Sequence, residues 1–316
     1  MNSKIPVRVA ALHAETAHVV SIRLQGLAGE ELPAFEPGAH IDLHLPNGLI
    51  RSYSLSGDPG DRSHYRIGVL HDRNSRGGSR LVHQTFAVGH ELEISAPRNH
   101  FPLDETAVES VFIAGGIGIT PMLPMVARML SLGRKVDLLY ACRSRADAAF
   151  LRHAQASLAS IETHFDDEAG HVLDLHRTMA GKSSDAHFYC CGPAPMLNAF
   201  EAAGAALGLK HLHLERFSAA PPVACAHASA FEVELARSGQ RYWIAPERSI
   251  LDVLLDEGFS LPYSCQAGIC GSCETAVLGG IPDHADSVLT NAEKAKNDRM
   301  LICVSRSRTA RLVLDL

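Results

Sequence analysis

Four cysteines in the C-terminal third constrain this chain more than any other feature. Cys265, Cys270 and Cys273 are separated by four and then two residues, and Cys303 follows after twenty-nine more. Three thiolates from one loop require a backbone that folds tightly around a small inorganic centre, with a fourth ligand from a distant segment. The C-x4-C-x2-C…C spacing is typical of a plant-type [2Fe–2S] site.

The residues between these cysteines suit such a site. Gly268 and Gly271 lie where a side chain would block the approach, and their amides can donate hydrogen bonds to sulfur. A zinc ion or unconnected core cysteines are the alternatives, although structural zinc favours two close pairs and Cys303 stands alone. Disulfides are not expected, because the chain shows no secretory segment. Reduced thiols are therefore expected at Cys142, Cys190, Cys191 and Cys225.

The composition narrows the class of protein. The chain has 316 residues, of which 46% are hydrophobic and 20% charged, which indicates a folded protein of two or three domains. A net charge of −6 argues against non-specific nucleic-acid binding. No apolar run reaches the ~18 residues that a transmembrane helix needs. The first residues resemble neither a signal peptide nor a transit peptide, which predicts a cytoplasmic location.

Residues 1–106 are predicted to form an antiparallel β-barrel domain. Short runs alternate apolar and polar residues and are separated by Pro-Gly, Asn-Gly and Gly-Asp turns. Six strands of this length and spacing suggest a small barrel. The predicted strands cover residues 7–15, 18–26, 40–45, 50–57, 64–71 and 90–97, and one helix begins near Ser79.

Two motifs in this domain favour a flavin site. The run RSYS at residues 51–54 places a phenol ring, able to lie flat on an aromatic cofactor, between hydroxyls and a guanidinium. The second motif, Gly77-Gly78-Ser79, opens a helix, where free amides and a hydroxyl can bind phosphate. An ordinary strand and an ordinary capped turn are the alternatives. Together, the motifs predict phosphate contacts from Arg51 and Ser79 and ring contacts from Tyr53 and Ser54.

Residues 107–222 are predicted to form a doubly wound parallel α/β domain, because strands here alternate with helices. Ligands of such sheets bind beyond the carboxyl ends of the strands. Gly115–Pro121 is a glycine-rich turn from strand to helix, where a backbone can approach a pyrophosphate or nicotinamide. A second turn, Cys190–Met196, should face the same crevice, although Gly-Pro after a strand is also an ordinary turn.

Residues 223–316 are predicted to form an α+β β-grasp domain around the cysteine motif. A hairpin at 231–245 and a helix at 249–258 precede the cysteine loop, and a terminal strand follows it. Residues 218–230 are rich in small residues and proline, which predicts a linker. Trp243 is expected to be a core residue or a cover for the cluster.

The order of these motifs resembles the phthalate dioxygenase reductase family of the ferredoxin-NADP reductase superfamily. The resemblance rests on RSYS, GGS, GGIGITP, CGPAPM, ERF and the C-terminal cysteine spacing, and it covers nearly the whole chain. It implies FMN contacts from Arg51, Ser52, Tyr53, Ser54, Gly68, Val69, Leu70, Gly78 and Ser79. It implies NADH contacts from Gly115, Gly116, Gly118, Thr120, Gly192 and Pro193. Thr120, Cys191 and Phe217 correspond to positions beside the two rings, although Cys191 could be a small core residue and Phe217 a core anchor.

The resemblance also implies a function. The chain would pass electrons from NADH through FMN and a [2Fe–2S] cluster to a Rieske-type oxygenase, either an aromatic-ring dioxygenase or an O-demethylase. A reductase for a haem monooxygenase and a non-catalytic redox sensor are the alternatives. FAD is less expected than FMN, and NADPH is an alternative to NADH because Arg143 and Arg145 follow a strand where a 2′-phosphate could bind.

Overall fold

The computed structural model describes residues 4–72, 77–157, 161–217 and 229–316. The chain divides into two compact units, Met1–Phe217 and Ser218–Leu316. Most of the predicted linker, and Cys225 within it, lies outside the described residues. Among the helices that the structure describes, none is both long and apolar enough to span a membrane.

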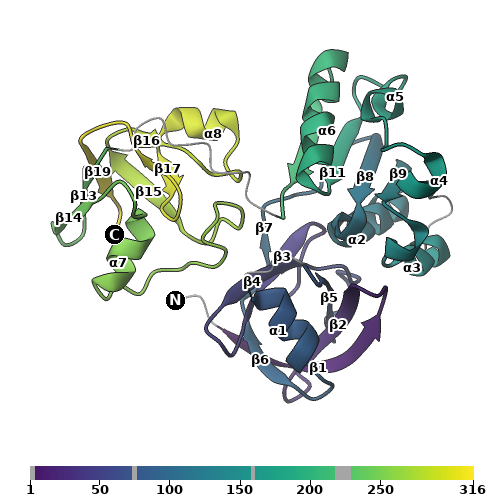
Figure 1. Cartoon of the computed structure of the whole chain (residues 1–316), viewed down its shortest axis with the longest axis horizontal. Helices are drawn as coiled ribbons and strands as arrows, with labels where there is room; N and C mark the ends of the chain where they lie inside the picture. Colours follow the sequence, from purple (N-terminus) through teal and green to yellow (C-terminus); the bar gives the residue numbers. More distant parts are fainter. Residues whose placement is uncertain (1–3, 73–76, 158–160, 218–228) are drawn as a thin grey trace. The chain divides into compact units, whose positions relative to one another are not determined.

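The first unit begins with the predicted antiparallel barrel (Figure 1). All six predicted strands are present, and the two-residue strand β7 was not predicted. The order across the sheet is β4-β3-β6-β1-β2-β5, and β7 pairs with β3. The strands are β1 Ile5–Ala14, β2 Val19–Gly26, β3 Ala39–His44, β4 Ile50–Ser54, β5 Tyr65–Leu70, β6 Glu91–Ile94 and β7 Arg98–Asn99.

The two edges of this sheet meet just after β4. Leu55 forms an antiparallel bridge with Ile67 on β5, and the Ser56 amide donates to the Arg66 carbonyl at 2.8 Å. The barrel encloses buried aliphatic side chains such as Ile22, which are the alternating apolar positions of the sequence. Helix α1, Gly78–Thr85, is seen over the ring of strands in Figure 1.

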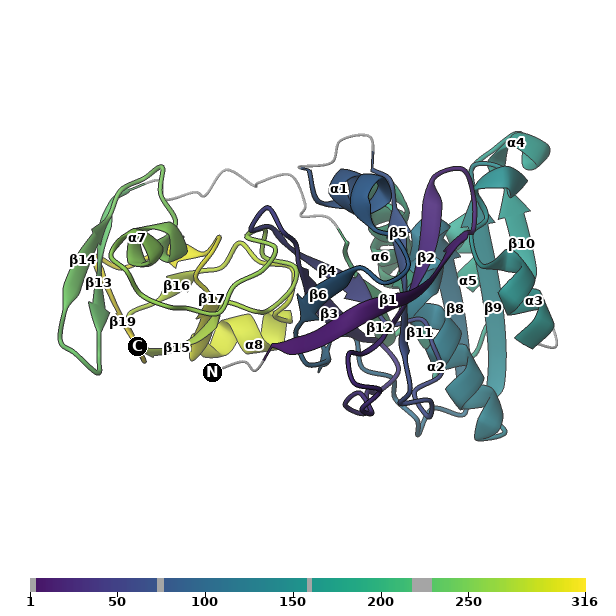
Figure 2. The ribbon, with the colours of Figure 1, turned by 90° about the horizontal axis from the view of Figure 1, so that it is seen from below.

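The second half of this unit is the predicted parallel sheet, whose strands lie side by side in Figure 2. The order is β10-β9-β8-β11-β12, with every pairing parallel. The strands are β8 Glu109–Gly115, β9 Lys135–Cys142, β10 Glu162–Phe165, β11 His187–Cys191 and β12 His211–Glu215. The helices are α2 Ile119–Ser131, α3 Leu151–Ser157, α4 Asp166–Ala169, α5 Leu175–Met179 and α6 Ala194–Leu207, with short 3-10 turns at Gly116–Gly118 and Arg145–Asp147.

Buried side chains cover both faces of the parallel sheet, as a doubly wound fold requires. On one face α2 packs over Phe112 and Tyr189, and barrel-side residues such as Phe101 join the same core. On the other face α5 and α6 pack over Phe188 and Cys190. The shared core fixes the barrel against the sheet, so residues from both halves can form one site.

The second unit has the predicted β-grasp fold. Its sheet has the order β14-β13-β19-β15-β17, in which β13 and β19 are parallel and the other pairs antiparallel. The strands are β13 Phe231–Leu235, β14 Arg241–Ile244, β15 Glu274–Gly279, β16 Pro282–Asp283, β17 Arg299–Leu301, β18 Arg306–Ser307 and β19 Arg311–Leu314. The helices are α7 Ile250–Asp256 and α8 Asn291–Lys296, both of which begin with a capping box.

The expectation for Trp243 was wrong. This side chain lies on the edge strand β14 and is 66% exposed, so it neither fills the core nor covers the cysteine loop. Its neighbour Ile244 points inward and is fully buried. Because successive side chains of a strand face opposite sides, only one of the two can enter the core, and the strand buries the aliphatic one.

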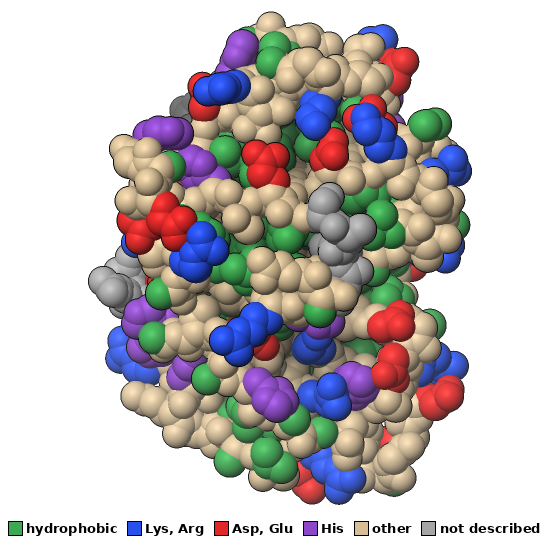
Figure 3. All heavy atoms as spheres, turned by 90° about the vertical axis from the view of Figure 1, so that its right-hand side faces the viewer, with side chains coloured by type: hydrophobic (Ala, Val, Ile, Leu, Met, Phe, Trp, Pro, Cys, Tyr) green, Lys and Arg blue, Asp and Glu red, His purple; other side chains and the backbone are tan. Residues whose placement is uncertain are grey.

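The surface carries charges of both signs. On the face shown in Figure 3, the Lys and Arg side chains are interspersed with Asp and Glu rather than gathered by sign.

Candidate functional site

The four predicted ligand cysteines are buried and fall into two pairs. The Cys265 thiol is hydrogen-bonded with Cys270, and the Cys303 thiol with Cys273. The exposed fractions of the four residues are 8%, 4%, 3% and 8% in chain order. Cys265 and Cys270 lie on the same loop, whereas Cys273 and Cys303 come from segments far apart in the sequence.

Backbone amides of the loop surround these sulfur atoms. The Ala267 amide donates to Cys265 Sγ at 3.3 Å and the Cys265 amide to Cys270 Sγ at 3.4 Å. The Gly268 amide donates to the Cys303 thiol. Gly268 has a φ of 68°, and a side-chain carbon there would lie 2.7 Å from Cγ2 of Val304, so only glycine fits this close approach.

This donor set fits a two-iron cluster better than one zinc ion. A structural zinc ion requires four ligands converging on one point. Across the described ranges, no group of three or more Cys, His, Asp or Glu residues could hold a single metal ion. Two thiol pairs ringed by amide donors are the ligands that a [2Fe–2S] cluster takes, with negative sulfur atoms stabilised by hydrogen bonds.

The residues predicted to bind the flavin phosphate lie together at the start of α1. The Arg51 side chain passes directly over Gly78, since a side-chain carbon added at Gly78 would lie 2.7 Å from Arg51 Nε. Ser79 follows in the first turn, and its Oγ accepts from the Asp72 amide at 3.4 Å. The guanidinium, a hydroxyl and the N-terminal amides of α1 therefore lie together, as binding of a phosphate requires.

Replacing Arg51 by methionine is expected to weaken FMN binding. Loss of a charge-assisted hydrogen bond of about 2 kcal/mol corresponds to roughly 30-fold in the dissociation constant. The measurement is a titration of apoprotein with FMN, followed by flavin fluorescence. Lys4→Met is the control, because it removes an exposed charge from the same barrel. Equal affinities of R51M and the control would refute the assignment.

Tyr53 and Ser52, also in the RSYS motif, have different surroundings. Tyr53 is partly buried against the barrel core, and burial raises the pKa of its phenol to about 12, so the ring stays neutral. Ser52 donates to Asp42 Oδ1 at 2.7 Å, and Asp42 forms an ion pair with Arg98 at 2.6 Å. The structure therefore uses the Ser52 hydroxyl to anchor β4, and its role as a cofactor contact stays a prediction.

The two predicted glycine-rich loops meet, as the sequence implied. A side-chain carbon at Gly115 would lie 2.8 Å from Pro193 Cδ and 3.1 Å from Gly192 Cα. At Gly118 it would overlap the carbonyl group of Cys191. The loops after β8 and β11 thus form one surface at the carboxyl ends of these strands, where a dinucleotide is expected to bind.

The flavin-side strand β5 touches this surface. A side-chain carbon at Gly68 would lie 2.9 Å from Thr120 Cγ2 and 3.1 Å from Ile117 Cδ1. Thr120 is itself held by a hydrogen bond from its hydroxyl to the Ile117 carbonyl at 2.9 Å. Next to Gly68, Val69 is buried and Leu70 is 39% exposed. A barrel residue predicted to bind flavin, Gly68, therefore lies against Thr120, which is predicted to bind NADH.

Glu215 is a candidate functional residue that the sequence reasoning missed. It ends β12, and its Oε2 accepts a hydrogen bond from the Ser54 hydroxyl at 3.4 Å, which joins the sheet to the RSYS motif. Burial raises the pKa of the Glu215 carboxyl to about 8. The signal available in the sequence was an acidic residue closing a strand directly before the ERF aromatic, but pattern alone does not show that it reaches Ser54.

The raised pKa predicts a pH-dependent reduction of the flavin. As the pH rises through about 8, Glu215 ionises, and its negative charge would disfavour the negative charge that a flavin bound at Ser54 gains with a hydride. The rate of flavin reduction by NADH should therefore fall, by roughly tenfold for about 1.4 kcal/mol. In Glu215→Gln the profile should be flat across this range, as rapid-mixing absorbance would show. An unchanged alkaline decline in E215Q would refute the role.

The same group affects stability with a defined sign. Its pKa in the folded chain, about 8, lies above the ordinary value of 4.5. Its contribution to folding is therefore fully present below pH 4.5 and is lost as the pH rises through about 8. E215Q lacks this loss.

Cys191 and Phe217 are the other residues predicted to lie beside the flavin and nicotinamide rings. Cys191 ends β11 of the parallel sheet. Cys191 is fully buried in the core, and burial raises the pKa of its thiol, so it remains neutral. Phe217 follows β12 and is 38% exposed, so it is not the core anchor considered as the alternative. Its exposed ring is available to cover a flavin. Both roles beside the rings stay predictions.

Arg145, one of the two arginines considered as a 2′-phosphate site, already binds other side chains of the protein. The Arg145 guanidinium makes two hydrogen bonds to Glu168, each of 2.9 Å, and lies 4.4 Å from the centre of the Phe165 ring. A carboxylate at this position repels a phosphate. The arrangement favours NADH over NADPH.

Comparisons with known proteins match a domain in each of the two units. A domain family described as a 2Fe-2S iron-sulfur cluster binding domain matches residues 233–308, and an oxidoreductase NAD-binding domain matches residues 112–202. Phenoxybenzoate dioxygenase subunit beta of Ectopseudomonas oleovorans is 47% identical, over 99% of this chain and 97% of that protein. Vanillate O-demethylase oxidoreductase of a Pseudomonas species, strain HR199, is 41% identical, over 99% and 100%.

Solved structures resemble the chain over almost its full length. Phthalate dioxygenase reductase, described as a modular structure for electron transfer from pyridine nucleotides to [2Fe–2S], is 35% identical with a TM-score of 0.72, and the match covers 99% of this chain and 98% of that one. An intact type IV self-sufficient cytochrome P450 monooxygenase is 38% identical with a TM-score of 0.91. There the match covers 99% of this chain but only 41% of the P450 chain.

Proposed function

This chain belongs to the phthalate dioxygenase reductase family, and we propose that it is the NADH-dependent reductase component of a Rieske-type oxygenase system. It takes NADH, FMN and a [2Fe–2S] cluster and delivers electrons to a separate terminal oxygenase. The oxygenase is an aromatic-ring dioxygenase or an O-demethylase, as the names of the full-length relatives suggest.

The residues present fit these cofactors. The cluster would be held by the pairs Cys265 with Cys270 and Cys273 with Cys303. The FMN phosphate would be held by Arg51 and the start of α1, where the guanidinium already lies over Gly78. When bound, the flavin accepts a hydride from NADH, and flavin and cluster together release the electron pair one electron at a time.

The protein's own contribution is mainly orientation. Gly115, Gly118 and Gly192 let two loop backbones meet so that a nicotinamide can enter beside Thr120. Gly68 lets β5 approach the same loop, which brings the two ring sites together. Glu215 accepts a hydrogen bond from the Ser54 hydroxyl and stays protonated below pH about 8, which would avoid a negative charge beside a flavin ring bound at Ser54.

The observation that carries this proposal is the contact between Gly68 and Thr120. It supports the proposal because the strand predicted to bind flavin and the loop predicted to bind nicotinamide are in contact within one compact unit, as direct hydride transfer requires. A sensor that had lost the chemistry would have no use for this close contact. For the location we infer the cytoplasm, which is supported by the described cysteines all being free thiols.

A second candidate is a reductase that serves a haem monooxygenase. The full-length likeness to part of a self-sufficient cytochrome P450, at 38% identity, favours it specifically. The match covers only 41% of that P450 chain, so this chain corresponds to one part of it and not to the whole enzyme. A haem partner would therefore have to be a separate protein.

Electron delivery to purified partners separates the two candidates. The reductase, loaded with FMN and cluster, is mixed with NADH and either a Rieske oxygenase or a P450 lacking its own reductase. The proposal expects NADH-dependent product from the Rieske oxygenase and at most background turnover of the P450. The opposite preference would establish the second candidate, and failure with both, despite rapid cluster reduction, would refute an oxygenase partner of either kind.

A further inference from the structure

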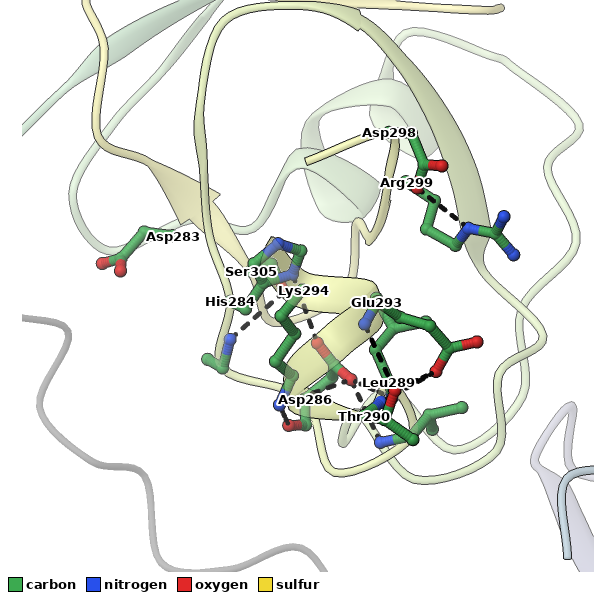
Figure 4. A network of polar contacts seen from close by, with 12 residues as sticks. Asp283, His284, Asp286, Leu289, Thr290, Glu293, Lys294, Asp298, Arg299 and Ser305 are labelled. Carbon is green, nitrogen blue, oxygen red and sulfur yellow. Dashed lines mark hydrogen bonds and ion pairs between the residues drawn. The ribbon is translucent and has the colours of Figure 1, made fainter. Parts of the chain in front are cut away.

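A buried pair of titratable side chains, His284 and Asp286, lies in the second unit (Figure 4). The Asp286 side chain is completely enclosed, and the His284 side chain is 6% exposed. His284 Nδ1 lies 3.6 Å from Asp286 Oδ2. Both ring nitrogens of His284 lack a hydrogen-bond partner among the residues that the structure describes. The same is true of Asp286 Oδ2.

Only half of the Asp286 carboxylate has a structural role. Its Oδ1 accepts from the amides of Val288 and Leu289, at 3.0 and 2.8 Å, and so fixes the turn before α8. An asparagine would offer the same carbonyl oxygen to these two amides. Burying a carboxylate costs several kcal/mol unless it is well paired, so the turn alone does not explain the charge.

The pair is close to the proposed cluster. The amide of Ser287 donates to the carbonyl of Gly268 at 2.9 Å, and a side-chain carbon at Gly268 would lie 3.1 Å from Asp286 Cα. The Gly268 amide in turn donates to the Cys303 thiol. Charges in such an enclosed region interact more strongly than they would in water, so an electron on the cluster would raise the proton affinity of His284.

Two further charged groups act on this pair, Lys294 and Arg308. Lys294 on α8 donates to the Asp286 carbonyl at 2.6 Å, and its Nζ lies 3.9 Å from Oδ1. Arg308 follows β18 and bonds Asp283 on β16 at 3.1 Å. Burial lowers the pKa of His284, Asp286 raises it, and Lys294 and Arg308 lower it further. His284 is the only histidine in residues 229–316, so no other imidazole of these residues acts on the cluster.

We propose that Asp286 and His284 form a charge site that sets the reduction potential of the cluster and links it to proton uptake. Entry of an electron into the cluster from NADH is accompanied by proton uptake from solvent at His284, beside Asp286. When the electron leaves to the acceptor protein, the proton returns to solvent. The inference rests on the proposed function, and it assigns Asp286 and His284 as positioning residues that act through the cluster environment.

The test is the midpoint potential of the cluster as a function of pH, measured by redox titration of the full-length, fully loaded protein. His284→Gln removes the titrating ring, and Asp286→Asn removes the charge but keeps the acceptor for Val288 and Leu289. Ser305→Ala is the matched control, since the Ser305 hydroxyl accepts from the Ala285 amide of the same loop at 3.3 Å and does not titrate.

The wild-type potential should fall as the pH rises through the range in which His284 loses its proton, because deprotonation removes a positive charge. A tenfold difference in the proton affinity of His284 between the two cluster states corresponds to ~59 mV. The slope should be absent in H284Q and unchanged in S305A. In D286N the potential at alkaline pH should be higher than in wild type, and the pH-dependent range should move to lower pH.

A wild-type potential independent of pH, or a wild-type slope retained in H284Q, would overturn the proposal. If H284Q does not keep its cluster, D286N decides alone, and a D286N potential equal to wild type at every pH would also overturn it. A protein that takes up no cluster at all would contradict the proposed function instead, so the two failures are distinguishable.

Discussion

Cys270→Ser is expected to abolish electron delivery to the oxygenase while sparing the flavin reaction. Serine is a poor ligand for iron compared with a thiolate, and Cys270 is one of two sulfurs in its pair. Electron transfer from NADH to the oxygenase should fall by ~100-fold or more, because the cluster is the exit from the chain. Reduction of ferricyanide, which the flavin can perform directly, should stay within about twofold of wild type.

Cys190→Ser is the control for this prediction. Cys190 is also fully buried, but it lies in the core between the parallel sheet and α5 and α6. C190S should keep the visible absorbance of the cluster, and C270S should lose it. Retention of oxygenase-dependent turnover in C270S would contradict the cluster's place in the electron path, and equal loss of the cluster in both variants would contradict the ligand assignment.

Gly118→Ala is expected to disrupt the nicotinamide site and destabilise the first unit. The added methyl group would overlap the carbonyl of Cys191, and both partners are backbone, so neither loop can yield cheaply. We expect the free energy of unfolding to fall by about 3 kcal/mol, the upper end for overpacking. Flavin reduction by NADH should slow by roughly 100-fold, since misplacing the ring by about 1 Å has an effect of this size.

Gly133→Ala is the matched control for the same chemical change. Gly133 has a φ of 68° and no atom near the added carbon, so its cost is backbone strain alone, about 1 kcal/mol. Denaturation should be followed by flavin fluorescence, because the one tryptophan, Trp243, reports the second unit. If G118A and G133A lose equal stability and both reduce flavin normally, the contact between the loops after β8 and β11 does not contribute to function.

The sequence predicted those parts of the site that depend on local spacing. Three of the four cysteines, the helix at Gly78 and the turn after β8 each lie in one short segment, so their chemistry can be read from neighbouring residues. The alternating strands and the parallel sheet were likewise predictable, because their hydrophobic periods differ.

The sequence could not predict contacts between distant segments. Glu215 meets Ser54 across 161 positions of the chain, and nothing in either local pattern announces the pair. The two-residue strand β7 is too short to show alternation. Trp243 was misplaced because a tryptophan on a short strand suggests burial, whereas β14 lies at the sheet edge and buries its other face.

The path of electrons within this one chain is tested most directly by mixing the loaded wild-type protein with NADH in the absence of oxygen. Absorbance is followed in time at a flavin wavelength and at a cluster wavelength. We expect the flavin band to bleach first and the cluster band to follow, with one NADH supplying both electrons. A flavin band that bleaches while the cluster band remains unchanged would contradict the account.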